Sequence, residues 1–172
     1  MNEDVLYTLA QVGVTLAGFS GVVVAFRVQG AHKWAPLELR ALWFLIGDSF
    51  LVLLFSLLPI LLSLAGWTDD SVWAACSASL GTWFIIGNLL YLSGDAKDRA
   101  THSRITVPFI TPIFQGMGIV SFMMGIALWL SAFGLIVPRN QAFYVFGLMT
   151  LLVYVAVEFL FFIAVISQQE RE

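Results

Sequence analysis

The sequence has little charge, one cysteine and two histidines, and each shortage excludes a class of protein. Charged residues make up 11% of the 172 residues, whereas soluble domains typically carry about 25%. The single cysteine, Cys76, cannot form a disulfide within the chain. His32 and His102 have Asp95 and Asp98 nearby, but their spacing is not that of a closed ligand set. We therefore expect no metal centre.

Catalytic motifs are also missing. The sequence contains no HExxH, GxSxG, Walker or GxGxxG motif. A serine nucleophile needs a base at a matching depth, and the long apolar runs hold neither histidine nor lysine. We therefore expect no enzymatic activity and no cofactor, and nothing in the sequence supports a nucleic-acid partner.

What the sequence does contain is apolar residues in long runs. Hydrophobic residues make up 60% of the chain, and the mean hydropathy is +0.92. A run of about 20 apolar residues is long enough for a helix to cross ~30 Å of hydrocarbon. These runs predict an all-α, polytopic transmembrane helical bundle, with the whole chain, 1–172, as one transmembrane domain. Its five predicted spans are residues 5–26, 41–65, 71–93, 113–136 and 142–166.

The distribution of basic residues predicts the orientation in the membrane. The acidic leader and the length of the first run are unlike a secretory signal, so we interpret this run as a retained first helix. With the amino terminus outside, seven of the eight basic residues fall on the inner side and only Arg139 falls outside. Cytoplasmic loops are enriched in lysine and arginine. We expect the amino terminus outside and the carboxyl terminus inside.

Two carboxylates lie within the apolar runs, Asp48 in the second and Glu158 in the fifth. A charged side chain at the centre of a membrane helix costs roughly 2.5–3.5 kcal/mol on insertion scales. Since no basic residue lies in any apolar core, we expect these two groups to be protonated, hydrated or bound to a cation. If they are close, the pair could share one proton. Alternatively, a protonated carboxyl simply bonds across helices, worth around 0.6 kcal/mol.

Counting residues from the cytoplasmic ends of the spans places further polar groups near the level of Asp48 and Glu158, between ~5 and ~15 Å from the inner boundary. Thr150, Tyr154 and Glu158 follow one another at a spacing of four, and Ser56 follows Ser49 by one heptad. Neutral amides are also ordinary contacts between membrane helices. The predicted ion or proton pathway comprises Ser20, Asp48, Ser49, Asn88, Gln115, Tyr154 and Glu158.

Small residues at helical spacing predict where helices approach closely. Membrane helices associate through small-xxx-small stripes because lipid supplies no hydrophobic force between them. Stripes in the first, third and fourth spans predict a close-packed centre made by these three helices. The predicted packing residues are Gly13, Ala17 and Gly21 in the first span and Gly118 and Gly125 in the fourth.

The segment LAQVGVTLAGFSG at residues 9–21, together with Arg40 and Leu58-Pro59, resembles a group of small uncharacterised bacterial membrane proteins. Members of this group share an AGFSG-type first helix and an arginine-led second helix that passes through a Leu-Pro. The resemblance implies a location in the bacterial inner (cytoplasmic) membrane. It implies no activity.

Two hypotheses about function follow. The first is a cation- or proton-conducting channel, or a proton-coupled transport unit, with Asp48 and Glu158 in the pathway. Its partners would be membrane lipids, an inorganic cation or a proton, and further copies of the chain, because a thin five-helix bundle favours a homo-oligomer. The second is a non-transporting scaffold or sensor whose buried carboxyls lock helix packing or oligomerisation.

Overall fold

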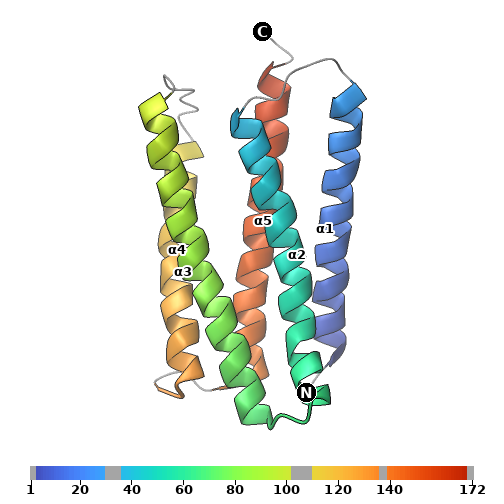
Figure 1. Ribbon diagram of the computed structural model, residues 1–172, viewed down its shortest axis with the longest axis vertical. Helices are drawn as coiled ribbons and strands as arrows, with labels where there is room; N and C mark the ends of the chain where they lie inside the picture. The colour runs from blue at the N-terminus through green and yellow to red at the C-terminus, as the bar shows by residue number, and fades with distance from the viewer. Residues whose placement is uncertain (1–2, 30–35, 102–109, 136–138, 170–172) are drawn as a thin grey trace. The chain divides into compact units, whose positions relative to one another are not determined.

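The chain folds into five long helices. The computed structural model describes residues 3–29, 36–101, 110–135 and 139–169 (Figure 1). The all-helical prediction is confirmed, and each helix contains a stretch long and apolar enough to cross a membrane. The helices are α1 (Glu3–Gln29), α2 (Pro36–Leu64), α3 (Asp69–Thr101), α4 (Ile110–Ala132) and α5 (Gln141–Gln169).

The helices are not limited to the apolar runs. The third apolar run predicts a span that ends at residue 93, but α3 continues to Thr101. Hydropathy marks the part of a helix that lies in lipid, whereas a helix ends only where its backbone hydrogen bonds stop. The second apolar run predicts a span that begins at residue 41, but α2 already begins at Pro36. Proline suits the first turn of a helix, because amides there have no partner within the helix and proline has no amide proton.

The chain divides into two compact units, which are described separately. The first unit comprises Met1–Ala65 and Leu148–Glu172, and therefore contains α1, α2 and most of α5. Figure 1 shows α1 and α2 running side by side in opposite directions. They approach closely at Gly13, where an added Cβ would lie 3.0 Å from the Ser49 carbonyl oxygen.

The second unit, Gly66–Gly147, contains α3, α4 and the first residues of α5. The helices α3 and α4 pack together at a pair of glycines. A Cβ added at Gly81 would lie 2.9 Å from the Gly125 carbonyl oxygen, so the two backbones nearly touch. At the start of α5 the buried Tyr144 ring packs against the Trp73 ring of α3, with 5.9 Å between the ring centroids.

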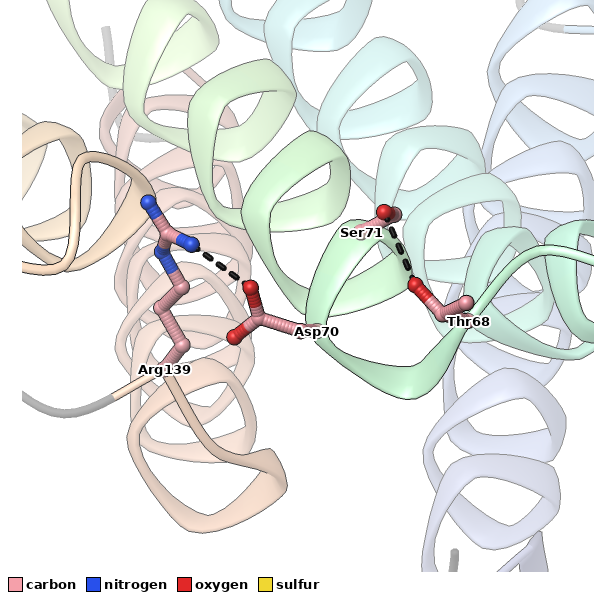
Figure 2. Close-up of polar contacts among 4 residues, drawn as sticks. All are labelled: Thr68, Asp70, Ser71 and Arg139. Carbon is pink, nitrogen blue, oxygen red and sulfur yellow. Dashed lines mark hydrogen bonds and ion pairs between the residues drawn. The ribbon is translucent and has the colours of Figure 1, made fainter.

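Polar residues fix the helix starts of the second unit. Thr68 precedes α3 and its hydroxyl donates to the Ser71 hydroxyl at 2.9 Å, as Figure 2 shows. Asn140 precedes α5, and its side-chain oxygen accepts a hydrogen bond from the Phe143 amide at 2.9 Å. The Asn140 bond satisfies an amide that lacks a partner within the helix, which is why Ser, Thr, Asp and Asn are preferred before a helix. The Thr68 bond joins two hydroxyls instead.

A glycine ends α4. Gly134 has a φ of 67°, a left-handed conformation that favours glycine. Its amide donates to the Ser131 carbonyl at 2.9 Å, and the Leu135 amide donates to the Leu130 carbonyl at 3.0 Å. These two bonds form a Schellman motif, which satisfies carbonyls at the helix end.

An ion pair joins the segment between α4 and α5 to the first turn of α3. The Arg139 guanidinium donates to the Asp70 carboxylate at 2.7 Å (Figure 2). Arg139 also packs on the Gly134 turn, since a Cβ added at Gly134 would lie 3.1 Å from its Nε. The pair therefore fastens the turn after α4 to the first residues of α3.

The predicted packing residues have different surroundings within their own units. Gly13 packs against α2, which has no such stripe at that point, and an added Cβ at Gly21 would meet nothing within 4 Å. Ala17 is half-buried. Gly125 does lie in a close crossing, with Gly81 of α3, and Gly118 lies beside the Asn88 side chain. A small residue permits a close approach, but it does not specify which helix approaches.

Candidate functional site

The structure brings Asp48 and Glu158 together. Asp48 lies on α2 with only 8% of its surface exposed, and Glu158 lies half-buried on α5. A hydrogen bond joins the two side chains. These residues are 110 positions apart in the sequence, so the contact depends on how the helices of the first unit pack.

Two aromatic rings and one glycine explain this packing. The Phe159 ring of α5 meets the Phe19 ring of α1 edge to face, with 5.2 Å between the centroids. Such pairs are favourable beyond the area they bury. Because Gly13 holds α1 tightly against α2, a contact between α5 and α1 also places α5 near α2. Glu158 directly precedes Phe159, so the Phe19–Phe159 contact also fixes the height of Glu158 along α5.

A hydrogen bond between two carboxyl groups requires a proton. An ionised carboxylate only accepts hydrogen bonds, so one partner must carry the donating O–H. The pair as bonded therefore holds at most one negative charge. The Oε2 atom of Glu158 is inaccessible to solvent and has no hydrogen-bond partner. An oxygen left in this way is unusual in a buried site and often marks a missing water or ion.

The serines predicted at this level are buried but use their protons locally. The Ser20 hydroxyl donates to the Leu16 carbonyl at 2.8 Å, and the Ser49 hydroxyl donates to the Leu45 carbonyl at 2.7 Å. Both serines are fully buried. Each hydroxyl oxygen keeps lone pairs that can still accept a hydrogen bond. The hydroxyl oxygens of Ser20 and Ser49, which are buried inside the first unit, can therefore each accept a further hydrogen bond.

Tyr154 lies one helical turn before Glu158 on the same face of α5. It is half-buried and has an interaction of its own. Tyr154 and Glu158 therefore lie on one face of α5, one turn apart.

Asn88 and Gln115 belong to the second unit and have different environments. The Asn88 side-chain amide donates to the Gly118 carbonyl at 3.1 Å, which ties α3 to α4. The Ser121 hydroxyl makes a similar bond to the Phe84 carbonyl at 3.1 Å. Gln115 is exposed. The amides that the sequence placed in one polar layer with the carboxylates thus include one interhelical contact and one side chain on the outside of α4.

The residue that sequence reasoning did not select is Ser56. Its side chain is fully buried on α2, and its hydroxyl has no hydrogen-bond partner. The heptad spacing from Ser49 was the available signal. That spacing gives the helix face but not the direction of the hydroxyl, which depends on the surrounding side chains.

Within the described part of the chain, no group of three or more histidine, cysteine or acidic side chains is placed to hold a metal ion. His32, His102 and the side chains of Asp95, Asp98 and Arg40 lie outside the described positions. Among the described residues of the candidate membrane spans, the structure brings two acidic side chains together, those of Asp48 and Glu158.

No protein family, curated protein or solved structure matches this chain.

Proposed function

We propose that the chain is a proton- or cation-conducting membrane protein that uses Asp48 and Glu158 as its binding site. The observation that supports this proposal is the hydrogen-bonded carboxyl pair with one buried oxygen left unsatisfied. Acidic side chains in membrane spans usually mark ion pathways or proton relays, because burying them is costly.

The chemistry of the pair suits proton exchange. With one proton between them, the two groups carry one negative charge, and the unsatisfied Oε2 is a place where a second proton or a small cation would be stabilised. Arrival of a second proton neutralises the pair, and release of a proton to the other side restores it. A carboxylate pair of this kind selects cations over anions by charge alone.

The proposal includes an orientation and a membrane. Seven of the eight basic residues lie on one side of the predicted spans, which favours the amino terminus outside and the carboxyl terminus inside. The likeness of residues 9–21 to small bacterial membrane proteins favours the bacterial inner membrane.

A homo-oligomer is part of the same proposal. Gln115 is exposed near the start of the lipid-crossing part of α4, and an amide facing hydrocarbon without a partner is unfavourable. A neighbouring copy would supply a hydrogen-bond partner. Closed symmetric assemblies are the usual form of such association.

The second candidate is a scaffold or sensor, and the same hydrogen bond favours it. A bond between Asp48 and Glu158 fastens α2 to α5, which is what a packing lock would do. In that case the carboxyl pair would stabilise the first unit and conduct nothing.

Flux through liposomes distinguishes the two candidates. Purified protein in liposomes loaded with a pH-sensitive dye should dissipate an imposed pH gradient, with a potassium gradient tested in parallel. Asp48→Asn and Glu158→Gln keep the shape of each side chain but remove the ionisable group, and each should reduce flux to that of empty liposomes. Asp70→Asn is the matched control, since Asp70 is 70% exposed in its ion pair, and it should conduct normally.

The opposite results are equally clear. Wild-type protein that gives no flux in either gradient would refute conduction and favour the packing lock. If flux persists in both Asp48→Asn and Glu158→Gln, the carboxyl pair is not part of the pathway.

A further inference from the structure

One face of α1 carries polar and small residues that are exposed inside a candidate membrane span. They follow one another at spacings of three and four, so they lie along one side of the helix. This series, called the α1 seam below, consists of Thr8, Gln11, Thr15, Gly18 and Val22, all of them exposed. Another side of α1 carries Gly13, which packs against α2. The α1 seam is therefore a face that the packing of the first unit leaves uncovered.

The composition of the α1 seam, rather than its spacing, makes it unusual. Any exposed helix face repeats at three and four residues. A comparable exposed series on α5 is wholly apolar: Met149, Val153, Ala156, Leu160 and Ile163. The hydrocarbon chains of lipid suit such a face. The α1 seam instead presents an amide, two hydroxyls and a glycine, and lipid offers no hydrogen bonds to these groups.

Gln11 is the residue of the seam that lacks a partner. The candidate span of α1 is Glu3–Val22, and Gln11 lies ~12 Å along the helix from its amino-terminal end. The seam threonines bond locally, since the Thr8 and Thr15 hydroxyls each donate to a carbonyl four residues earlier at 2.8 Å. Among the residues that the structure describes, none bonds to the Gln11 side-chain amide. An amide in an apolar medium without such a bond is costly.

Gly18 permits a close approach to the seam. It is exposed, and a Cβ added there would meet nothing within 4 Å. The packing of a single chain therefore does not require a glycine at this position, although glycine is less favourable than alanine inside a helix. In membrane proteins glycine allows two helix backbones to come close together. A second helix lying on the α1 seam would account for both Gly18 and Gln11.

A second copy of the chain is the partner that best fits the seam. Two copies inserted in the same orientation are parallel, and a two-fold axis along the membrane normal sets each seam residue opposite its own counterpart at the same depth. A glutamine amide both donates and accepts hydrogen bonds, so Gln11 is complementary to itself. A different partner would have to present a polar group at this same depth.

The order of residues along the seam also favours two parallel helices. Alternating spacings of three and four are those of the a and d positions of a left-handed coiled coil, a common geometry among membrane helices. One position is β-branched throughout, with Thr8, Thr15 and Val22, and the other holds Gln11 and Gly18. In parallel coiled coils β-branched residues at a favour two strands, and a single polar residue in the seam fixes the register.

We propose that the α1 seam is a homodimer interface, in which the α1 helices of two copies lie parallel and the two Gln11 amides bond to each other within the membrane. This interface rests on the homo-oligomer proposed above and is independent of conduction. The next seam position toward the amino terminus is Asp4, which is exposed at the end of the helix. Salt screens the repulsion of two carboxylates there.

The first arm of the test measures association in detergent. Light scattering of the full-length protein should give twice the 19.0 kDa mass of one chain. Gln11→Leu removes the amide and should raise the dissociation constant of the dimer roughly tenfold, the value of one hydrogen bond between membrane helices in model peptides. Gln11→Asn keeps an amide and should remain dimeric at the concentrations where the wild-type protein is dimeric.

Two exposed glycines of α1 provide a matched comparison. A Cβ added at Gly18 or at Gly21 would meet nothing within 4 Å, so neither Gly18→Leu nor Gly21→Leu should disturb a single chain, which circular dichroism checks. Gly21 directly precedes Val22 and lies about 100° round the helix from it, off the seam. Gly18→Leu should therefore be monomeric at concentrations where Gly21→Leu is dimeric. Equal association of the two variants would overturn the interface.

The second arm locates the contact in lipid. In a Cys76→Ala background, Thr15→Cys places a single thiol in the seam, and Leu54→Cys places one on α2, where Leu54 is 60% exposed. Oxygen with a copper–phenanthroline catalyst joins two thiols when their Cβ atoms come within about 4.5 Å. Thr15→Cys should form a covalent dimer roughly tenfold faster than Leu54→Cys, which meets another copy only by collision.

The outcomes separate the interface from the function. A monomeric wild-type protein would overturn both the α1 interface and the homo-oligomer, and flux would still decide conduction. An oligomer in which Thr15→Cys reacts no faster than Leu54→Cys would overturn the α1 interface alone. A dimer that is joined rapidly at position 15 but conducts nothing would retain the interface and refute conduction.

Discussion

The two units of this protein use their buried polar groups differently. In the second unit two polar side chains donate to backbone carbonyls of the neighbouring helix: Asn88 to Gly118 and Ser121 to Phe84. In the first unit two acidic side chains bond to each other and leave one oxygen unsatisfied. The Asn88 and Ser121 side chains fasten α3 to α4, whereas the carboxyl pair of the first unit retains one oxygen that can still accept a hydrogen bond.

This difference distinguishes polar groups that only hold helices together from a pair of groups that can also exchange protons. The Gly118 carbonyl accepts an amide proton from Asn88 and the Phe84 carbonyl accepts a hydroxyl proton from Ser121, and neither carbonyl has a proton of its own to exchange. These two contacts therefore hold helices together. A carboxyl pair gains or loses protons, and its unsatisfied oxygen can take a new ligand. Burial alone would not have distinguished Ser121, which is 8% exposed, from Asp48, which is also 8% exposed.

The largest effect on stability is expected at the glycine crossings, one in each unit. Gly81→Ala places a Cβ 2.9 Å from a backbone oxygen, and Gly13→Ala places one 3.0 Å from another. Neither backbone can yield without shifting a helix, so each substitution should destabilise its unit by about 1–3 kcal/mol. Gly21→Ala, where nothing lies within 4 Å, should change stability by no more than about 1 kcal/mol.

Thermal unfolding in detergent measures both crossings. Cys76 is fully buried, so a thiol-reactive fluorophore reports the opening of the second unit, and circular dichroism reports the whole chain. Among molecules that remain folded, Gly13→Ala should also reduce flux, because α1 fixes the level of the carboxyl pair, while Gly81→Ala should not. Equal losses of flux at the two crossings would contradict the division of roles between the units.

A smaller effect is expected at Asn88. Asn88→Ala removes one interhelical hydrogen bond, which in membrane proteins averages about 0.6 kcal/mol. The melting temperature should fall slightly, and flux per folded molecule should be unchanged. If Asn88→Ala abolished flux as Glu158→Gln is expected to, the second unit would also carry part of the pathway.

The smallest effect is expected at the ion pair outside the spans. Asp70→Asn breaks the contact with Arg139, but Asp70 is 70% exposed, and exposed pairs are typically worth about 0–1 kcal/mol. The loss in melting temperature should shrink further in high salt, because salt screens the pair in the wild-type protein as well. A large loss that is independent of salt would contradict this expectation and mean that Asp70 contributes more than a screened surface charge.

Much of the fold was predictable from the sequence because lipid imposes a simple rule. A helix that crosses hydrocarbon must satisfy its backbone internally and present apolar side chains, so five long apolar runs predict five helices. The cost of burying a carboxylate in hydrocarbon is enough to mark Asp48 and Glu158 as candidate site residues from the sequence alone.

Helix partners and hydroxyl directions were not predictable. The stripe at Gly13 permits a close approach by any helix, and only packing shows that α2 is the one that approaches. Asn88 and Asp48 are alike as polar residues in apolar runs, yet one bonds to a backbone and the other to a second acid. The burial of the Ser56 hydroxyl without a hydrogen-bond partner depends on tertiary packing, which no local pattern contains.

The central claim is that Asp48 and Glu158 share a proton that exchanges with water, and infrared spectroscopy tests it most directly. Wild-type protein in lipid at neutral pH should show the carbonyl stretch of a protonated carboxyl, and this band should shift promptly on transfer to D₂O and be lost in Glu158→Gln. A band that resists exchange for hours would identify a sealed packing lock. The absence of any such band would show that the two groups share no proton, which would contradict the claim outright.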